Sequence, residues 1–441
     1  MNPELQRLLW LELTPTRVGS VLATVVAMLA LGWLIDGRAP GATTSTFALA
    51  GFVIFTLAWG AMQVSASMLD ELRQRTWDQQ RMSALSPWTM TWGKLAGAGA
   101  LPWLAGLIAL AAHAGAAPTA DLPWRLLLLT AGAMLVHGLA LFGALLMLQR
   151  DTAGRSSQVL RTLGALGVLW AALSFTRRTD GVLDWFGGVY PALPFIAIVV
   201  SLLAAWAVFG AYRLMCEALQ VRTLPWALPA FILFATVLVA GFFVDVNTAR
   251  LTRSLVTTGT GLLLSLASAY FCAFALRTDP LLPHRLAVPV RDGDWLRALS
   301  MLPLPLVALA VGGAFAIAAR NVTGASVDTG SGLQAALLEQ VTAGALPVFL
   351  YALRDMVVLF GLNRGARHGR FEMTAIVYLA LAYWLLPAIL AFTGLPAAGR
   401  LLAPLPWLRP DEAAFILLGH VALAAGGVWL TRPGRRHLPA T

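Results

Sequence analysis

The 441-residue chain contains very few charged side chains. Only 12% of its residues are Asp, Glu, Lys or Arg, whereas 59% are hydrophobic. There is a single lysine, Lys94, and there are two cysteines, Cys216 and Cys272, each in or beside an apolar run. Two isolated cysteines indicate neither a disulfide framework nor a metal site. The apolar residues come in unbroken blocks of about 20, so the composition excludes an ordinary water-soluble protein.

Sequence signatures of catalysis are also missing. The chain has no HExxH, no CxxC and no Walker A motif, and its six histidines are scattered. The pair Gly93-Lys94 follows no glycine loop, so it is not expected to cradle a phosphate. We therefore predict that the chain has no catalytic residue, no metal site and no cofactor of its own.

What the chain does contain is a long series of apolar runs. They predict an all-α polytopic membrane protein with about twelve transmembrane helices, each able to cross a hydrocarbon core of about 30 Å. The predicted spans are residues 18–35, 45–67, 95–116, 124–148, 158–176, 190–212, 225–245, 254–276, 298–319, 337–361, 373–393 and 412–431. Residues 1–17 precede them as an amphipathic surface helix.

The distribution of basic residues predicts the orientation in the membrane. If the N-terminus is cytoplasmic, the inside segments hold 22 of the 31 Lys and Arg residues and the outside segments hold 9. This excess places both termini in the cytoplasm of a multi-pass protein of the bacterial inner membrane. It also accounts for the net charge of +10 without a nucleic-acid partner.

A weak internal repeat divides the chain into residues 1–220 and 221–441. An Arg–Glu–Arg pattern (Arg7, Glu12, Arg17) precedes the first span, and a similar one (Arg213, Glu217, Arg222) precedes the seventh. A duplication predicts two six-span transmembrane halves, with residues 220–225 as the seam. Evenly spaced spans without a duplication would look alike, so both interpretations remain open.

The densest group of charges lies between the second and third spans, in residues 68–95. It contains Asp70, Glu71, Arg73, Arg75, Asp78, Arg81 and Lys94. So many charges must lie in water or at the membrane surface. Helical spacing predicts an ion pair between Glu71 and Arg75. Ser86-Pro87 then predicts an N-cap and the first residue of the next helix, which completes a charged helical hairpin.

The residues of this hairpin resemble a segment of ABC-2 type permeases. The similarity rests on Glu71, Arg75-Thr76-Trp77-Asp78, Met82-Ser83-Ala84-Leu85-Ser86-Pro87 and Gly93-Lys94, about 25 residues in all. In that family the segment is the coupling helix, which docks on the ATPase subunit. Arg75 stands where the family usually has a glycine before threonine.

The resemblance implies the permease subunit of an ATP-driven exporter. ATP and Mg²⁺ would then be bound by separate cytoplasmic ABC ATPase subunits, and substrate would move outward. It assigns the coupling to the ATPase to Asp70, Glu71, Arg73, Arg75, Thr76, Trp77, Asp78, Arg81, Met82, Leu85, Ser86 and Pro87. The plainer interpretation is that any polytopic protein has one charged cytoplasmic loop.

Two other classes of protein fit part of the pattern. Twelve spans with both ends inside also describe a proton-coupled secondary transporter, but the loop after the second span lacks Gly-x-x-x-Asp-Arg-x-Gly. A membrane enzyme acting on lipid-linked substrates would need acidic or histidine clusters on the outer side, and none occurs. The substrate is not readable from the sequence, nor is whether one chain or two copies form the transmembrane unit.

Three ionisable residues within later spans are candidates for a transport pathway or a conformational lock: Arg354, Asp355 and Glu339. Arg354 and Asp355 are neighbours on a helix and should point in different directions, so we expect them not to neutralise each other. In the alternative interpretation, the pair snorkels to the cytoplasmic interface and Glu339 faces lipid headgroups.

Overall fold

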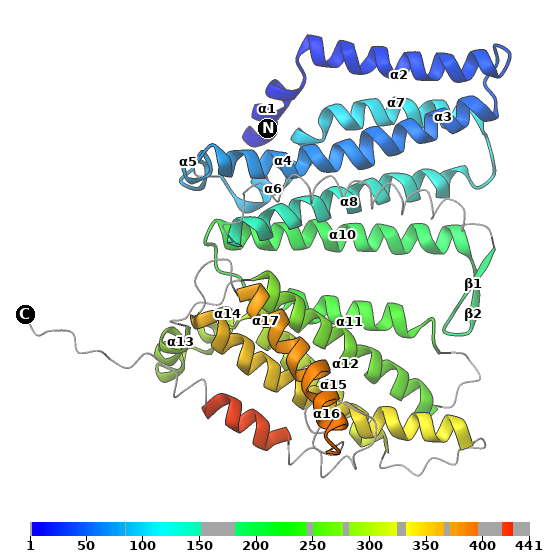
Figure 1. Cartoon of the computed structure of the whole chain (residues 1–441). Helices are drawn as coiled ribbons and strands as arrows, with labels where there is room; N and C mark the ends of the chain where they lie inside the picture. The colour runs from blue at the N-terminus through cyan, green and yellow to red at the C-terminus, as the bar shows by residue number, and fades with distance from the viewer. Residues whose placement is uncertain are drawn as a thin grey trace, which may run out of the picture. The chain divides into compact units, whose positions relative to one another are not determined.

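The computed structural model describes residues 2–83, 85–150, 181–244, 250–276, 282–323, 332–365, 371–395 and 417–426. These residues form helices and one two-stranded hairpin, β1 (Val182–Trp185) and β2 (Gly188–Pro191) (Figure 1). The chain divides into two compact units, the first made of residues 1–183 and 189–223 and the second of residues 184–188 and 224–441. The boundary between residues 223 and 224 lies within the predicted seam, residues 220–225. The number of spans in each half, six, remains a prediction.

Eight helices among the described residues are long and apolar enough to cross a membrane. They are Pro15–Ile35, Ala42–Arg73, Leu122–Leu148, Ala192–Ala218, Arg253–Ala275, Leu304–Asn321, Gly344–Asn363 and Met373–Phe392. Pro87–Ala98 and Ala100–Ala116 qualify together but bend by 54°, and Ala227–Ala240 and Leu417–Gly426 are apolar but shorter. The all-α polytopic class is therefore confirmed, whereas the predicted span at residues 158–176 lies outside the described residues.

The first unit is a layered bundle of long helices. Its elements are α1 (Pro3–Glu12), α2 (Pro15–Ile35), α3 (Ala42–Phe52), η1 (Val53–Trp59), α4 (Gly60–Arg73), α5 (Trp77–Arg81), α6 (Pro87–Ala98), α7 (Ala100–Ala116), α8 (Leu122–Arg150) and α10 (Ala192–Ala218). Helices α2, α3, α7, α8 and α10 run alongside one another, and α1 and α5 lie at one end of them (Figure 1). Apolar side chains of α4, α8 and α10 form the core behind α5.

Local capping sets the helix boundaries near this end. Asn2 caps α1, because its Oδ1 accepts hydrogen bonds from the backbone N–H groups of the first turn. The helix ends at Glu12 and α2 restarts at Pro15, so the single helix predicted over residues 1–17 is two separate helices. Helix α6 begins at Pro87, and the Ser86 Oγ accepts a hydrogen bond from the Thr89 N–H at 3.2 Å. The predicted N-cap is confirmed.

The second unit is also helical. Its elements are α11 (Ala227–Ala240), α12 (Arg250–Ala275), α13 (Leu282–Arg291), α14 (Trp295–Ser300), α15 (Leu304–Thr323), α16 (Gly332–Gly365), α17 (Phe371–Ala380), η2 (Leu381–Leu385) and α18 (Leu386–Phe392). Helices α12, α15 and α16 pack around one apolar core that includes Leu262, Leu309 and Met356. Small residues such as Ala269 and Ala308 let these helices approach closely.

Candidate functional site

The predicted charged hairpin is formed by the end of α4, the short helix α5 and the start of α6. Helix α4 ends at Arg73, and Arg75 takes a left-handed conformation with φ of 57°. The Arg75 N–H donates to the Leu72 carbonyl at 3.2 Å, and the Thr76 N–H donates to the Glu71 carbonyl at 2.9 Å. These two bonds form a Schellman motif, whose left-handed position favours glycine.

This turn makes the predicted ion pair between Glu71 and Arg75 wrong. The chain leaves the helix before Arg75, so the two residues are not one turn apart on a helix face. The Glu71 carboxylate instead receives hydrogen bonds from Lys94, Arg7 and Gln80.

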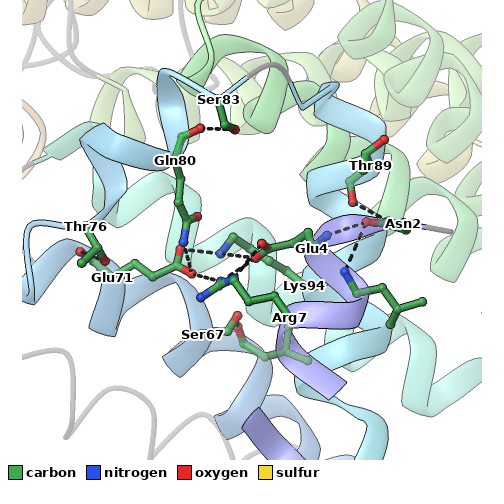
Figure 2. A network of polar contacts seen from close by, with 12 residues as sticks. Asn2, Glu4, Arg7, Ser67, Glu71, Thr76, Gln80, Ser83, Thr89 and Lys94 are labelled. Carbon is green, nitrogen blue, oxygen red and sulfur yellow. Dashed lines mark hydrogen bonds and ion pairs between the residues drawn. The ribbon is translucent and has the colours of Figure 1, made fainter. Parts of the chain in front are cut away.

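Glu71 lies at the centre of a group of charged side chains from three helices (Figure 2). Its Oε2 accepts a hydrogen bond from Nζ of Lys94, and its Oε1 accepts from Arg7 at 2.6 Å and from Gln80 at 2.7 Å. Glu4 Oε1 lies 3.4 Å from Nζ of Lys94 and 2.8 Å from Nη2 of Arg7. We call Glu4, Arg7, Glu71 and Lys94 the ion cluster, and its two negative and two positive charges cancel.

Three members of the ion cluster are shielded from water, whereas the side chain of Arg7 is 41% exposed. Lys94 is 0% exposed, Glu4 is 3% exposed and Glu71 is 8% exposed. Burial opposes ionisation of Glu4, but the hydrogen bond from Arg7 and the charges of Lys94 and Arg7 outweigh it, so the pKa of Glu4 is lowered. The hydrogen bond to Glu4 raises the pKa of Arg7 against the effect of burial. Glu4 and Arg7 are therefore both charged at neutral pH.

Two glycines on α6 let α1 approach closely enough to form the ion cluster. A Cβ atom on Gly93 would lie 2.5 Å from Cγ and 2.6 Å from Cβ of Glu4. A Cβ atom on Gly97 would lie 2.7 Å from Cβ of Leu8. Glycines four residues apart form one smooth strip on a helix, which is a common surface for close helix packing.

The structure separates the predicted coupling residues by the direction they face. Glu71 and Trp77 point inward and are buried. The outward-facing residues are Arg73, Arg75, Asp78, Arg81, Met82 and Ser86, and the partly buried ones are Asp70, Thr76, Leu85 and Pro87. Met82 is 81% exposed, at the outer tip of the hairpin. The buried members fix the shape of the hairpin, and the outward members are exposed on its surface.

A cavity of about 480 Å³ opens beside the hairpin, within the first unit. Its walls come from the hairpin and from the ends of α8 and α10. They are formed by Leu72, Arg75, Trp77, Asp78, Arg81, Leu148, Glu217 and Ala218. Apolar side chains next to charges of both signs suit an amphipathic protein segment better than a small anion.

The second predicted group, Arg354 and Asp355, lies on α16 in the second unit. Asp355 is fully buried and Arg354 is 6% exposed. Arg354 donates to Oδ1 of Asp355 from Nε at 3.1 Å and from Nη2 at 2.9 Å. The expectation that these neighbours do not neutralise each other is therefore wrong, because the long guanidinium arm folds back onto Asp355. Glu339 belongs to the same helix, but its side chain lies outside the described residues.

The sequence did not identify the partners of Lys94. A lone lysine beside a long apolar run signals a buried charge that needs carboxylate partners. Glu4, however, is 90 residues away in sequence, and spacing alone cannot select it. Arg7 and Gln80 were missed for the same reason, because both join the site only through tertiary packing.

These features define an all-α, multi-pass membrane protein that carries a charged hairpin held by buried ion pairs. Within the described residues, no group of three or more His, Cys, Asp or Glu side chains is placed to hold a metal ion. No protein-family model, no curated protein and no solved structure matches the chain.

Proposed function

We propose that the chain is the permease subunit of an ATP-driven, ABC-2 type exporter in the bacterial inner membrane. In this proposal both termini are cytoplasmic, and about twelve spans form two six-helix halves, residues 1–220 and 221–441. ATP and Mg²⁺ are bound by separate cytoplasmic ATPase subunits, and substrate moves outward. If the halves are a duplication, one chain forms the transmembrane unit; otherwise two copies pair.

The ion cluster is the observation that best supports this function. Helix α5 joins the ion cluster through Gln80, which donates to Glu71 on α4 at 2.7 Å. From Glu71 the cluster extends to α6 through Lys94 and to α1 through Arg7 and Glu4, so a force on α5 would reach all three helices. Buried ion pairs resist separation because pulling them apart leaves unpaired charges out of water. A loop that only connected two spans would not need buried ion pairs to hold its shape, whereas a loop that transmits motion to those spans would need them.

The turn at Arg75 supports the resemblance to the coupling-helix segment. The family usually has a glycine at this place, and glycine tolerates left-handed backbone better than any other residue. Arg75 has that conformation, with φ of 57°. A left-handed backbone is the conformation that glycine accommodates best, so it supports the alignment of Arg75 with the family's glycine.

The arginines of the first unit support a cytoplasmic position for the hairpin. Arg75 and Arg81 lie in the hairpin, and Arg213 lies near the end of α10 that contributes Glu217 to the adjacent cavity. Among the described residues, the basic residues beside the end of α2 and the start of α8 are Arg38 and Arg125 only. This asymmetry follows the positive-inside rule.

Cysteine labelling tests the orientation. Cys216 and Cys272 are both buried, so one introduced surface thiol should be labelled selectively. We expect Met82→Cys to react with a membrane-impermeant maleimide from the cytoplasmic side only. Ala39→Cys, at an exposed position after α2, should react from the outer side only. The reverse pattern would place the hairpin outside and contradict the function.

Coupling is tested in the complex with its ATPase, which should be encoded beside this chain or co-purify with it and carry Walker motifs. We expect Met82→Cys to form a crosslink to that ATPase. Charge reversal at Arg81 should reduce substrate-stimulated ATP hydrolysis, while charge removal at the exposed Asp121, near the start of α8, should not. Unchanged hydrolysis with no crosslink would contradict the assignment. Transport driven by a proton gradient without ATP would favour the secondary transporter.

A further inference from the structure

Four of the six tyrosines of the chain lie around one buried carboxylate in the second unit. Oδ2 of Asp355 accepts hydrogen bonds from the hydroxyls of Tyr270, at 2.6 Å, and Tyr383. Oδ1 accepts from the hydroxyl of Tyr378 at 2.8 Å. The ring of Tyr351 lies 6.5 Å from that of Tyr383, centre to centre. We call Asp355 and these four tyrosines the tyrosine cage.

A π-helix makes this arrangement possible. Tyr378 and Tyr383 are five residues apart, so on a regular α-helix their side chains would point about 140° away from each other. The π-helix η2 (Leu381–Leu385) widens the turn, and both hydroxyls reach Asp355. Such bulges are frequent at functional sites.

The side chain of Asp355 has more than one kind of hydrogen-bond partner. Three hydroxyls from α12, α17 and η2 donate to its two oxygens. Hydrogen bonds to a carboxylate stabilise the negative charge and fix its position. The carboxylate therefore keeps donors, even when Arg354 moves away.

In this structure the guanidinium of Arg354 occupies the tyrosine cage. Its central carbon lies 5.1 Å from the ring centre of Tyr351 and 5.5 Å from that of Tyr383, which are cation–π distances. Both of its hydrogen bonds to Asp355 go to Oδ1. An untethered cation could contact the same aromatic rings and the same carboxylate.

The location suits a ligand site in a membrane protein. Arg354 and Asp355 lie near the middle of the apolar segment Gly344–Asn363, where ionisable residues commonly mark substrate or ion pathways. Tyr270, Tyr378 and Tyr383 are partly exposed, so a ligand can contact them before it reaches the buried carboxylate. Few residues of the span that carries two of these tyrosines, Met373–Phe392, are buried.

We propose that the tyrosine cage binds the cationic group of an amphipathic organic substrate, which displaces Arg354. Aromatic faces beside a carboxylate are the groups with which proteins recognise organic cations. The inference deepens the proposed function by naming a substrate class. Binding is nevertheless a property of this chain alone, and its test requires no ATPase.

The test is equilibrium binding of tetraphenylphosphonium to the purified full-length protein in lipid nanodiscs. We expect saturable binding that Asp355→Asn weakens by about tenfold or more, because the anionic partner is lost. Arg354→Gln should strengthen binding by about tenfold, because it removes a tethered competitor. Asp121→Asn, which makes the same chemical change at an exposed site, should bind as the unmodified chain does. Tetraphenylborate has the same shape and opposite charge, and it should not compete.

A second pair of variants covers the case in which Arg354→Gln does not fold. Tyr351→Leu removes a ring and should weaken binding by about threefold or more, whereas Tyr351→Phe keeps the ring and should not. Two results would contradict the proposal: equal binding of the cation by Tyr351→Leu and Tyr351→Phe, or no saturable binding by the unmodified chain. The tyrosine cage would then have only a structural role, as the surroundings of the Arg354–Asp355 ion pair. If the cation binds but no ATPase partner exists, the inference stands and the proposed driving force is wrong.

Discussion

The amino group of Lys94 on α6 binds the carboxylate of Glu71 on α4, and both residues are buried. The two residues are on either side of the α5 segment in sequence, so their contact closes the charged hairpin at its base. Glu4 and Arg7 extend the same contact to α1. The hairpin, the N-terminal helix and the adjoining apolar helices are therefore joined as one rigid part of the first unit.

Removal of Lys94 should destabilise the protein. In Lys94→Met, Glu71 and Glu4 keep only Arg7 as a cationic partner, and a buried pair broken on one side costs about 3 kcal/mol or more. Thermal unfolding of the purified protein measures this loss.

Two further variants show whether burial is the cause. Combining Lys94→Met with Glu71→Met removes both charges and should recover most of the lost stability. Arg73→Ala breaks the exposed pair with Asp70, whose atoms are 3.3 Å apart, and should cost less than about 1 kcal/mol. Equal losses for Lys94→Met and Arg73→Ala would contradict the role of the ion cluster.

Gly93→Ala should separate α1 from α6. The added methyl group would lie about 2.5 Å from the side chain of Glu4, and overpacking of this kind typically costs about 1–3 kcal/mol. Thermal unfolding again provides the measurement. Gly132→Ala on α8 is the matched control, because no atom lies within 4 Å of its Cβ position, and it should be neutral or slightly stabilising. Similar effects of both substitutions would mean that the α1–α6 contact is not tight.

Arg75→Gly should stabilise the protein. A left-handed residue with a side chain costs about 1 kcal/mol relative to glycine, and Arg75 has φ of 57°. Arg75→Val should be destabilising, because a β-branched residue tolerates this conformation least. Chemical denaturation compares the two variants with the unmodified chain. A loss of stability in Arg75→Gly would show that the side chain of Arg75 contributes more than its backbone costs.

Stability should decrease in acid through Glu4. Its pKa in the folded protein is lowered from an ordinary value of 4.5, so the unfolded chain takes up the proton first as the pH falls. The contribution of Glu4 is therefore complete above pH 4.5 and is lost as the pH falls toward the folded pKa. Melting temperatures measured from neutral pH to about pH 3 should show this decline below pH 4.5. Glu4→Gln should lower the melting temperature at neutral pH and flatten the decline; an unchanged slope would exclude Glu4 as its source.

Local features of this chain were predictable because they depend on short stretches of sequence. The Ser86 cap and the start of α6 at Pro87 follow from two adjacent residues, and the apolar spans follow from about 20 consecutive side chains. The Glu71–Arg75 pair was predicted wrongly because the helix ends in a left-handed turn that arginine does not signal.

By itself, the sequence determined the class of the protein, the position of most apolar helices and the location of the charged hairpin, because hydropathy and capping are summed over neighbouring residues. Only the tertiary structure decided which charges are buried and with what partners. Lys94 contacts Glu4, which is 90 residues away in sequence. Asp355 accepts hydrogen bonds from tyrosine hydroxyls of three other elements. Such contacts depend on how closely distant helices approach, which glycines and a π-helix set in three dimensions.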